Sequence, residues 1–211
     1  MELERKIEIL AESAKYDVSC SSSGVENNTR QGTVGSTAVS GICHSFTPDG
    51  RCVSLLKLLF TNACIFDCHY CINRKSNAIP RATFTPQEVA DLTMDFYMRN
   101  YIEGLFLSSA IIKNPDYTCE LLIKTLKILR EEKGFRGYIH VKAIPGADEK
   151  LIEELGFLAD RMSVNVELPS RESLKLLAPD KDPFDLYKPM KQITTVKKEQ
   201  EFLPAVRRGP S

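Results

Sequence analysis

Residues 53–71, VSLLKLLFTNACIFDCHYC, carry the main signals for the fold and function of this sequence. The stretch opens with an apolar run, Val53–Phe60, which is typical of a strand that is buried on both faces. Cys64, Cys68 and Cys71 follow in a CxxxCxxC pattern. Three thiolates so close together are able to wrap one compact metal centre. Such soft ligands favour soft ions or an iron–sulfur cluster over calcium or magnesium.

Three cysteines leave one position of a tetrahedral site or of a four-iron cluster unfilled. An open position is typical of catalytic metal centres, whereas structural sites are closed. The alternative is a zinc site that is completed by a fourth side chain, for which the candidates are His69, Cys43, His44 and Cys52. Paired CxxC units, the commoner zinc pattern, do not occur in the sequence.

Apolar runs alternate with helical patterns after this stretch. The further predicted strands are Gly104–Ser109, Tyr138–Ala143 and Met162–Leu168. Helices are predicted from the N-cap Thr85, over Tyr117–Lys133, from the cap Asp148 to Leu155, over Ser170–Leu177 and over Asp182–Glu201. Four strand–helix repeats indicate an α/β fold with a parallel sheet, either a barrel or an open doubly wound sheet. No GxGxxG follows the first strand, which disfavours a dinucleotide-binding fold.

The region before Val53 lacks this regularity. Glu2–Ala14 predicts a short helix, and residues 15–52 are expected to form a long loop. Cys20, Cys43 and Cys52 lie in this loop and are candidate ligands of a second metal or auxiliary cluster. The predicted domain organisation is 1–52 for the helix and loop, 53–205 for the α/β region and 206–211 for an irregular tail.

The composition limits the class of protein. The 28 Lys and Arg residues balance 28 Asp and Glu residues, which argues against a generally basic, sequence-blind nucleic-acid binder. No apolar run approaches the roughly 20 residues of a membrane helix. Residues 1–14 show no signal-peptide pattern, so we expect a cytoplasmic protein without membrane contact. Seven cysteines in a reducing compartment indicate metal binding or catalysis rather than disulfides.

The CxxxCxxC pattern after the first strand of a parallel βα fold resembles the signature of the radical SAM superfamily, in which an aromatic residue precedes the last cysteine. Tyr70 supplies that aromatic residue. The resemblance implies a partial (βα) barrel, with about four βα units present. It implies a [4Fe–4S] cluster on Cys64, Cys68 and Cys71, with S-adenosylmethionine (SAM) on the fourth iron. An electron donor such as a flavodoxin or ferredoxin would then drive cleavage of SAM to a 5′-deoxyadenosyl radical.

Polar residues follow the predicted strands at the carboxyl ends, where βα barrels place their active residues. The resemblance implies that Ser108, Ser109, Asn165 and Glu167 position SAM and that Tyr70 contacts its adenine. The alternatives are that the two serines cap a turn and that Tyr70 is a packing residue. For Glu167, burial in an apolar strand would require a partner, which favours a functional role.

Three further residues of this region have structural alternatives. Lys142, at the end of the third strand, is either functional or an outward residue that pairs with an acid. His140 and Cys119 are expected to be structural.

A closer resemblance covers most of the chain. Its segments are similar to the radical SAM proteins assigned to DNA modification and repair, which implies a nucleic-acid substrate. These segments are SCSSSG (19–24), GICHSFTPDGRCVSLLKLLFTNACIFDCHYCINR (41–74), NYIEGLFLSSA (100–110), GYIHVKAIPGA (137–147) and SVNVELP (163–169). The basic residues Arg74, Lys75 and Arg81 either contact a phosphate-bearing substrate or belong to a solvated loop.

The chain also departs from this family. The family's barrel is followed by a helix-hairpin-helix segment, and radical SAM cores have six βα units, whereas only four are found here. Glu201–Ala205 looks like the beginning of a fifth strand. We therefore expect the N-terminal part of such a protein, in truncated form. The alternatives are a non-catalytic binding module stabilised by zinc or a cluster, and an inactive truncated product.

Overall fold

The computed structural model describes residues 1–14, 42–46, 50, 52–165, 168 and 170–182. Its centre is a five-stranded sheet in the order β1-β2-β3-β4-β5. β1 pairs with β2 in antiparallel fashion, and the other neighbouring strands are parallel. The strand bounds are β1 Ile42–Phe46, β2 Cys52–Leu59, β3 Gly104–Ser108, β4 Tyr138–Lys142 and β5 Arg161–Ser163.

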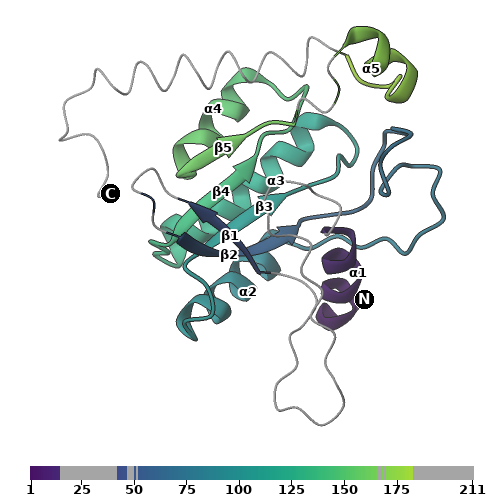
Figure 1. Ribbon diagram of the computed structural model, residues 1–211. Helices are drawn as coiled ribbons and strands as arrows, with labels where there is room; N and C mark the ends of the chain where they lie inside the picture. Colours follow the sequence, from purple (N-terminus) through teal and green to yellow (C-terminus); the bar gives the residue numbers. More distant parts are fainter. Residues whose placement is uncertain (15–41, 47–49, 51, 166–167, 169, 183–211) are drawn as a thin grey trace, which may run out of the picture.

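Helices follow the parallel strands, as the alternating pattern predicts (Figure 1). Apolar residues of β2, β3 and β4, such as Leu56, Leu105 and Ile139, share one buried cluster with residues of the three intervening helices. Burial of these side chains is the main source of stability for the layered arrangement. The helices are α1 Leu3–Ala14, α2 Pro86–Met98, α3 Pro115–Lys127, the π-helical turn η1 Ile128–Glu132, α4 Glu149–Leu158 and α5 Arg171–Leu177.

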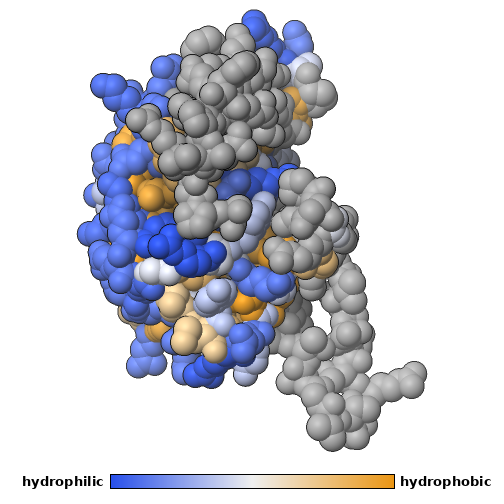
Figure 2. Space-filling view, turned by 90° about the vertical axis from the view of Figure 1, so that its left-hand side faces the viewer, coloured by the Kyte–Doolittle hydropathy of each residue, from blue (hydrophilic) through white to orange (hydrophobic). Residues whose placement is uncertain are grey.

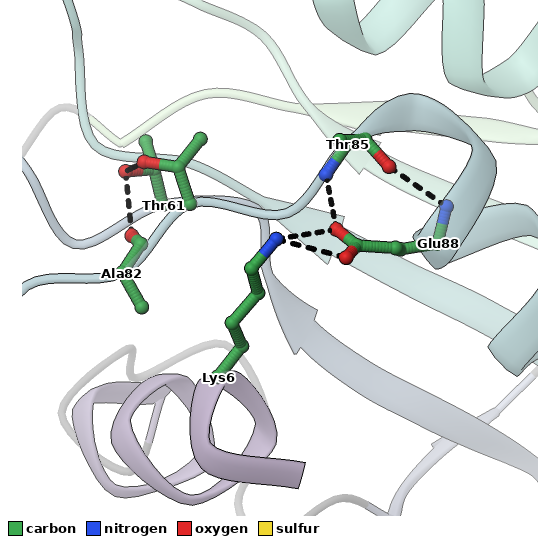
Figure 3. A network of polar contacts seen from close by, with 6 residues as sticks. Lys6, Thr61, Ala82, Thr85 and Glu88 are labelled. Atoms are coloured by element: carbon green, nitrogen blue, oxygen red, sulfur yellow. Dashed lines mark hydrogen bonds and ion pairs between the residues drawn. The ribbon is translucent and has the colours of Figure 1, made fainter. Parts of the chain in front are cut away.

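The start of α2 is fixed by the capping box that the sequence predicts (Figure 3). The Glu88 N–H donates to Thr85 Oγ1 at 3.2 Å, and the Thr85 N–H donates to Glu88 Oε2 at 2.7 Å. Lys6 Nζ, on α1, donates to both carboxylate oxygens of Glu88 at 2.8 Å. α1 also contributes Leu10 to the main core, so the N-terminal helix packs directly on the α/β region.

The opposite face of the sheet carries polar and charged side chains. The register places Phe106 of β3 between Lys57 of β2 and His140 of β4. Lys57, His140 and Lys142 are all buried on this face. The His140 ring meets the Phe106 ring edge-on with centroids 4.7 Å apart, and Lys142 Nζ lies 5.9 Å from the Phe106 centroid. We call this the inner face, because the other face packs against the helices.

β1 is a correction to the sequence analysis, which expects a loop over residues 15–52. Cys43 pairs with Leu55 in the antiparallel ladder and is buried with Val53 and Phe106. Alternation along β2 then turns Cys52 to the other side of the sheet, where it is exposed. Because Cys43 and Cys52 lie on opposite faces, the structure contradicts a second metal centre that both ligate. Cys20 lies outside the described residues.

Other element boundaries also differ from the predictions. The helix predicted from Tyr117 begins at Pro115, because the Asn114 side chain accepts a hydrogen bond from the Tyr117 N–H and caps the helix two residues earlier. β5 ends at Ser163, earlier than the predicted Leu168. The predicted segments Asp182–Glu201, Glu201–Ala205 and 206–211 lie, apart from Asp182, outside the described residues.

Hydrophilic side chains dominate the face shown in Figure 2, and hydrophobic ones appear as separate patches between them. This face is the left-hand side of Figure 1, away from the loop that follows β2. In the part of the chain that the structure describes, no helix is both long and apolar enough to span a bilayer.

Candidate metal and cofactor site

The three clustered cysteines lie on the loop between β2 and α2, residues 61–83, which we call the cysteine loop. Its two ends run side by side: Thr61 and Thr83 form a bridge, and Thr61 Oγ1 donates to the Ala82 carbonyl at 3.0 Å (Figure 3). The Phe84 N–H donates to the Phe60 carbonyl at 3.0 Å. The base of the loop is thereby joined to the end of β2.

Arg81 holds the interior of the cysteine loop together. Its guanidinium donates to the carbonyls of Asn62, Asn73, Arg74 and Asn77 at 2.5–2.9 Å. One planar group with fixed donors therefore joins Asn62, before the cysteines, to the segment Asn73–Asn77 after them. Neither of the two alternatives, phosphate contact or a solvated loop position, fits Arg81, since its guanidinium is engaged within the loop.

The other two basic residues of that prediction differ from each other. Arg74 donates to Asn77 Oδ1 at 2.9 Å and to the His69 carbonyl at 3.0 Å, so its side chain also stabilises the cysteine loop. Lys75 is exposed, in agreement with a solvated surface position.

α5 and the residues after it pack on the cysteine loop, which extends between α1 and α5 at the right of Figure 1. The His69 N–H donates to the Leu177 carbonyl at 2.7 Å. The Asp67 N–H donates to Asp180 Oδ2 at 2.9 Å. Cys68 is buried in a small cluster with Leu174, so contacts over a long sequence separation fix the middle of the loop.

A cavity of about 850 Å³ lies between the cysteine loop and the carboxyl ends of β3 and β4. Its volume is within the range of about 300–1,000 Å³ that is common for small-molecule sites. Cys64, Cys68 and Cys71 all line this cavity. Four of the five residues predicted to position SAM line it as well: Tyr70, Ser108, Ser109 and Asn165. Glu167, the fifth, lies outside the described residues.

The two serines differ in their local bonds. Ser109 Oγ donates to the Ala110 carbonyl at 2.6 Å. Ser108 is buried, and its Oγ lies 3.5 Å from the Leu58 carbonyl, which is long for a hydrogen bond. Lys142 is buried and also lines the cavity, which excludes the alternative of an outward position for this residue.

The two residues that were expected to be structural are buried. His140 Nε2 lies 2.8 Å from Ser163 Oγ, within hydrogen-bond distance. Cys119 belongs to the main core, and burial raises its pKa to about 12. The position of Cys119 confirms the sequence analysis, and the structural role of His140 stays a prediction.

The protein alone does not favour the thiolate form at Cys71. Burial raises the pKa of its thiol, and the nearby Cys64 adds to this effect. The Asn73 N–H and the charges of Lys181 and Arg81 act in the opposite direction, with smaller influence. A bound metal would supply the missing driving force, because a coordinating thiol loses its proton to the metal.

The donor set fits an iron–sulfur cluster. Among the described residues, no three His, Cys, Asp or Glu side chains, those of the cysteine loop included, form a ready site for a single ion. A four-iron cluster is larger, and its cysteine ligands bind different iron atoms. Three thiols around one shared cavity match that requirement, and the cavity leaves room for a second ligand beside them.

The sequence analysis missed several residues of this site. Ser13 of α1 lines the cavity, and its Oγ accepts a hydrogen bond from Asn62 Nδ2 at 3.1 Å. Asn73 lines the cavity too, and its buried Oδ1 accepts no hydrogen bond in the part of the chain described. For Asn73, the position next to the cysteines was the only feature of the sequence that could have indicated a role in the site. For Ser13, the sequence contains no such feature.

The family model described as the radical SAM superfamily matches residues 58–197 of the 211. A comparison with curated proteins finds no match.

Solved structures with a similar fold include two of HydG, a maturase of the [FeFe]-hydrogenase. The match with one of them covers 66% of this chain and 32% of the HydG chain, with 18% identity and a TM-score of 0.52. The match with the other, from Carboxydothermus hydrogenoformans, covers 66% of this chain and 33% of the HydG chain, with 19% identity and a TM-score of 0.57. The match with methylornithine synthase (PylB) covers 66% of this chain and 40% of the PylB chain, with 17% identity and a TM-score of 0.54. At these identities the likeness is one of fold, and this chain spans roughly a third of the length of each HydG structure.

Proposed function

The chain belongs to the radical SAM superfamily, and from this we propose that it binds a [4Fe–4S] cluster and SAM and generates a 5′-deoxyadenosyl radical. Cys64, Cys68 and Cys71 would hold the cluster. The observation that carries the proposal is that all three thiols line one cavity, on a family-matched segment of the chain. The chemistry supplied by a reduced cluster with bound SAM is cleavage of the sulfonium C–S bond.

The residues around the cavity would bind and orient SAM. We assign this role to Ser108, Ser109 and Asn165, with Tyr70 at the adenine, and the support is that all four line the cavity. Glu167 is proposed for the same role from its sequence position. The Arg81 hydrogen bonds would keep the three thiols in register, and α5 would limit access of water from one side.

A one-electron donor must reach the site from solvent. Tyr70 and Ile65 of the cysteine loop are 44% and 37% exposed, so the loop forms part of the molecular surface. We propose that a flavodoxin or a ferredoxin delivers the electron at this loop. The need for reduced thiols supports the cytoplasm as the compartment.

The substrate is proposed to be a nucleic acid. The support is the similarity of the sequence runs 41–74 and 100–110 to radical SAM proteins of DNA modification and repair. The test is to incubate the reduced, SAM-loaded chain with DNA or RNA and to measure modified nucleosides by mass spectrometry. The proposal predicts a new nucleoside that depends on SAM, and unchanged nucleosides with both polymers would contradict it.

The cluster and SAM proposal has a spectroscopic test. After anaerobic reconstitution and reduction, we expect the electron paramagnetic resonance signal of a [4Fe–4S] cluster, and we expect it to change when SAM is added. The same signal without any change on SAM addition would contradict SAM binding at the cluster. Retention of zinc with no iron would instead support the binding-module alternative.

A further inference from the structure

The charged side chains that line the cavity are all basic. Among the described residues at its wall, these are Arg74, Lys142 and Lys181, and no Asp or Glu accompanies them. The sequence as a whole balances 28 Lys and Arg with 28 Asp and Glu, so this bias is a local feature of the site. A concave surface that is lined by charges of one sign raises the local concentration of ions of the opposite sign. The cavity therefore fits a ligand with a negatively charged group.

The three cations come from different sides of the cavity. Arg74 belongs to the cysteine loop and donates to the His69 carbonyl at 3.0 Å. Burial raises the pKa of Cys71 and the charge of Lys181 acts in the opposite direction, which places this lysine on the side of the thiols. Lys142 is the last residue of β4 and comes from the sheet. Arg74 and Lys181 are therefore near the proposed cluster, whereas Lys142 is positioned for a ligand between the cluster and the sheet.

The direction of the Lys142 side chain follows from the alternation along β4. Ile139 and Val141 belong to the main core between the sheet and the helices, so Lys142 points to the inner face. The residue is 7% exposed, and its Nζ lies 5.9 Å from the centroid of the Phe106 ring. Long lysine side chains commonly carry the ammonium group to bulk water. Lys142 lies instead at a cavity wall, where a bound oxyanion would offset the cost of keeping a charge away from bulk water.

Lys57 shows that a buried lysine on this face need not belong to the cavity. It lies on β2 in the same row as Phe106 and His140, and it is 6% exposed. Lys57 does not line the cavity, whereas Lys142 does. Two lysines of nearly equal burial on the same face therefore differ in their access to a ligand, and they offer a matched comparison.

We propose that Lys142 Nζ binds an oxyanion of the ligand in the cavity through a charge-assisted hydrogen bond. This inference rests on the proposed function. The proposed ligands offer two such groups, the carboxylate of SAM and a phosphate of a nucleic-acid substrate. The chemistry of the contact is the same in both cases, and pairs of ligands with and without the oxyanion distinguish the two sources.

The test compares Lys142→Met with Lys57→Met in the reconstituted 211-residue chain. Methionine has nearly the length of lysine but no charge. The ligands are SAM and its decarboxylated analogue, and a single-stranded DNA oligonucleotide and its uncharged methylphosphonate analogue. For Lys142→Met, we expect the dissociation constant for SAM or for the oligonucleotide, measured by equilibrium dialysis, to rise about tenfold or more. The analogue that lacks the oxyanion should bind as tightly as it does to wild type, and the affected pair identifies the source of the oxyanion.

Lys57→Met is the matched control, since it removes the same charge from the same face of the sheet but not from the cavity. We expect it to leave all four dissociation constants at the wild-type values. Both variants should keep the iron content of wild type, because both lysines lie on strands and not on the cysteine loop. Lys142→Arg keeps the positive charge and should retain most of the affinity that Lys142→Met loses.

Four results would overturn the inference. The first is an equal affinity of wild type and Lys142→Met for both SAM and the oligonucleotide. The second is an equal loss of affinity for a ligand and its analogue, or the same loss in Lys57→Met, which would indicate a general disturbance of the inner face. The third is a fall in iron content or in the melting midpoint of the ligand-free Lys142→Met protein, which would make Lys142 structural. The fourth is a reconstituted wild type that binds neither SAM nor DNA, and only this result would also remove the proposed function.

Discussion

The main-chain N–H of His69 donates a hydrogen bond of 2.7 Å to the main-chain carbonyl of Leu177. This bond joins the middle of the CxxxCxxC motif to the end of α5, across more than half of the chain. Beside it, Leu174 and Cys68 are both buried in one small cluster. The cysteine loop is therefore held by tertiary contacts with α5 as well as by its own hydrogen bonds, and each set of contacts has a testable consequence.

Truncation of Leu174 should weaken the packing of α5 on the cysteine loop. Leu174→Ala removes a side chain that is 3% exposed, and we expect a loss of about 2–5 kcal/mol in unfolding free energy. We also expect faster bleaching of the reconstituted cluster in air. Leu176→Ala is the control, because Leu176 lies on the same helix and is 71% exposed, so its effect should stay within about 0.5 kcal/mol. Equal bleaching rates in both variants would show that α5 does not protect the site.

Replacement of Arg81 should release the carbonyls that it gathers. Arg81→Lys keeps the positive charge but not the planar set of donors, so we expect it to fail as a substitute. The expected loss of unfolding free energy is on the order of 3 kcal/mol, and iron retention after reconstitution should fall. Lys75→Met, at an exposed position of the same loop, is the control and should retain iron. Full iron retention in Arg81→Lys would contradict the role assigned to the guanidinium.

The Lys6–Glu88 ion pair should make stability depend on acid pH. Burial by itself would raise the pKa of Glu88, but the hydrogen bonds from Lys6 and Thr85 hold it below 4.5. A carboxylate whose pKa is lowered on folding contributes stability that is complete above its unfolded value. That contribution is lost as pH falls through the folded value. We therefore expect the free energy of unfolding to fall as pH drops below about 4.5.

Lys6→Met tests this pair directly. We expect a loss of about 1 kcal/mol at neutral pH and a shallower decline in acid, measured by urea unfolding between pH 3 and 7 (about the range in which carboxyl groups titrate). Arg5→Met is the control, because Arg5 pairs with Glu8 at the surface, where both side chains are more than half exposed. The same acid slope in Lys6→Met and wild type would mean that this pair contributes nothing to the pH dependence.

Much of the fold could be predicted because its signals are local. The apolar run Val53–Phe60 gives β2 to within one residue at each end. The Thr85 capping box gives the start of α2, since the residues that form it are three apart in sequence. The cysteine loop was likewise identified from spacing alone, and its thiols do line one cavity.

The remainder depends on contacts between distant segments. β1 is only five residues long, and it exists as a strand through its ladder with β2 and the burial of Cys43. Arg81 looks like any basic loop residue until folding brings four carbonyls around it. Ser13 reaches the cavity only because α1 packs beside the cysteine loop. Neither hydrophobic periodicity nor a short sequence motif predicts such contacts between distant segments.

The most direct test of the central claim is the formation of 5′-deoxyadenosine by the anaerobically reconstituted chain with SAM and a reductant. We predict that wild type and Cys52→Ser form it, because Cys52 is exposed on the far side of the sheet from Cys43 and does not line the cavity. We predict that Cys68→Ala forms none. Formation of 5′-deoxyadenosine by Cys68→Ala at the wild-type rate, or by none of the three proteins, would contradict the account.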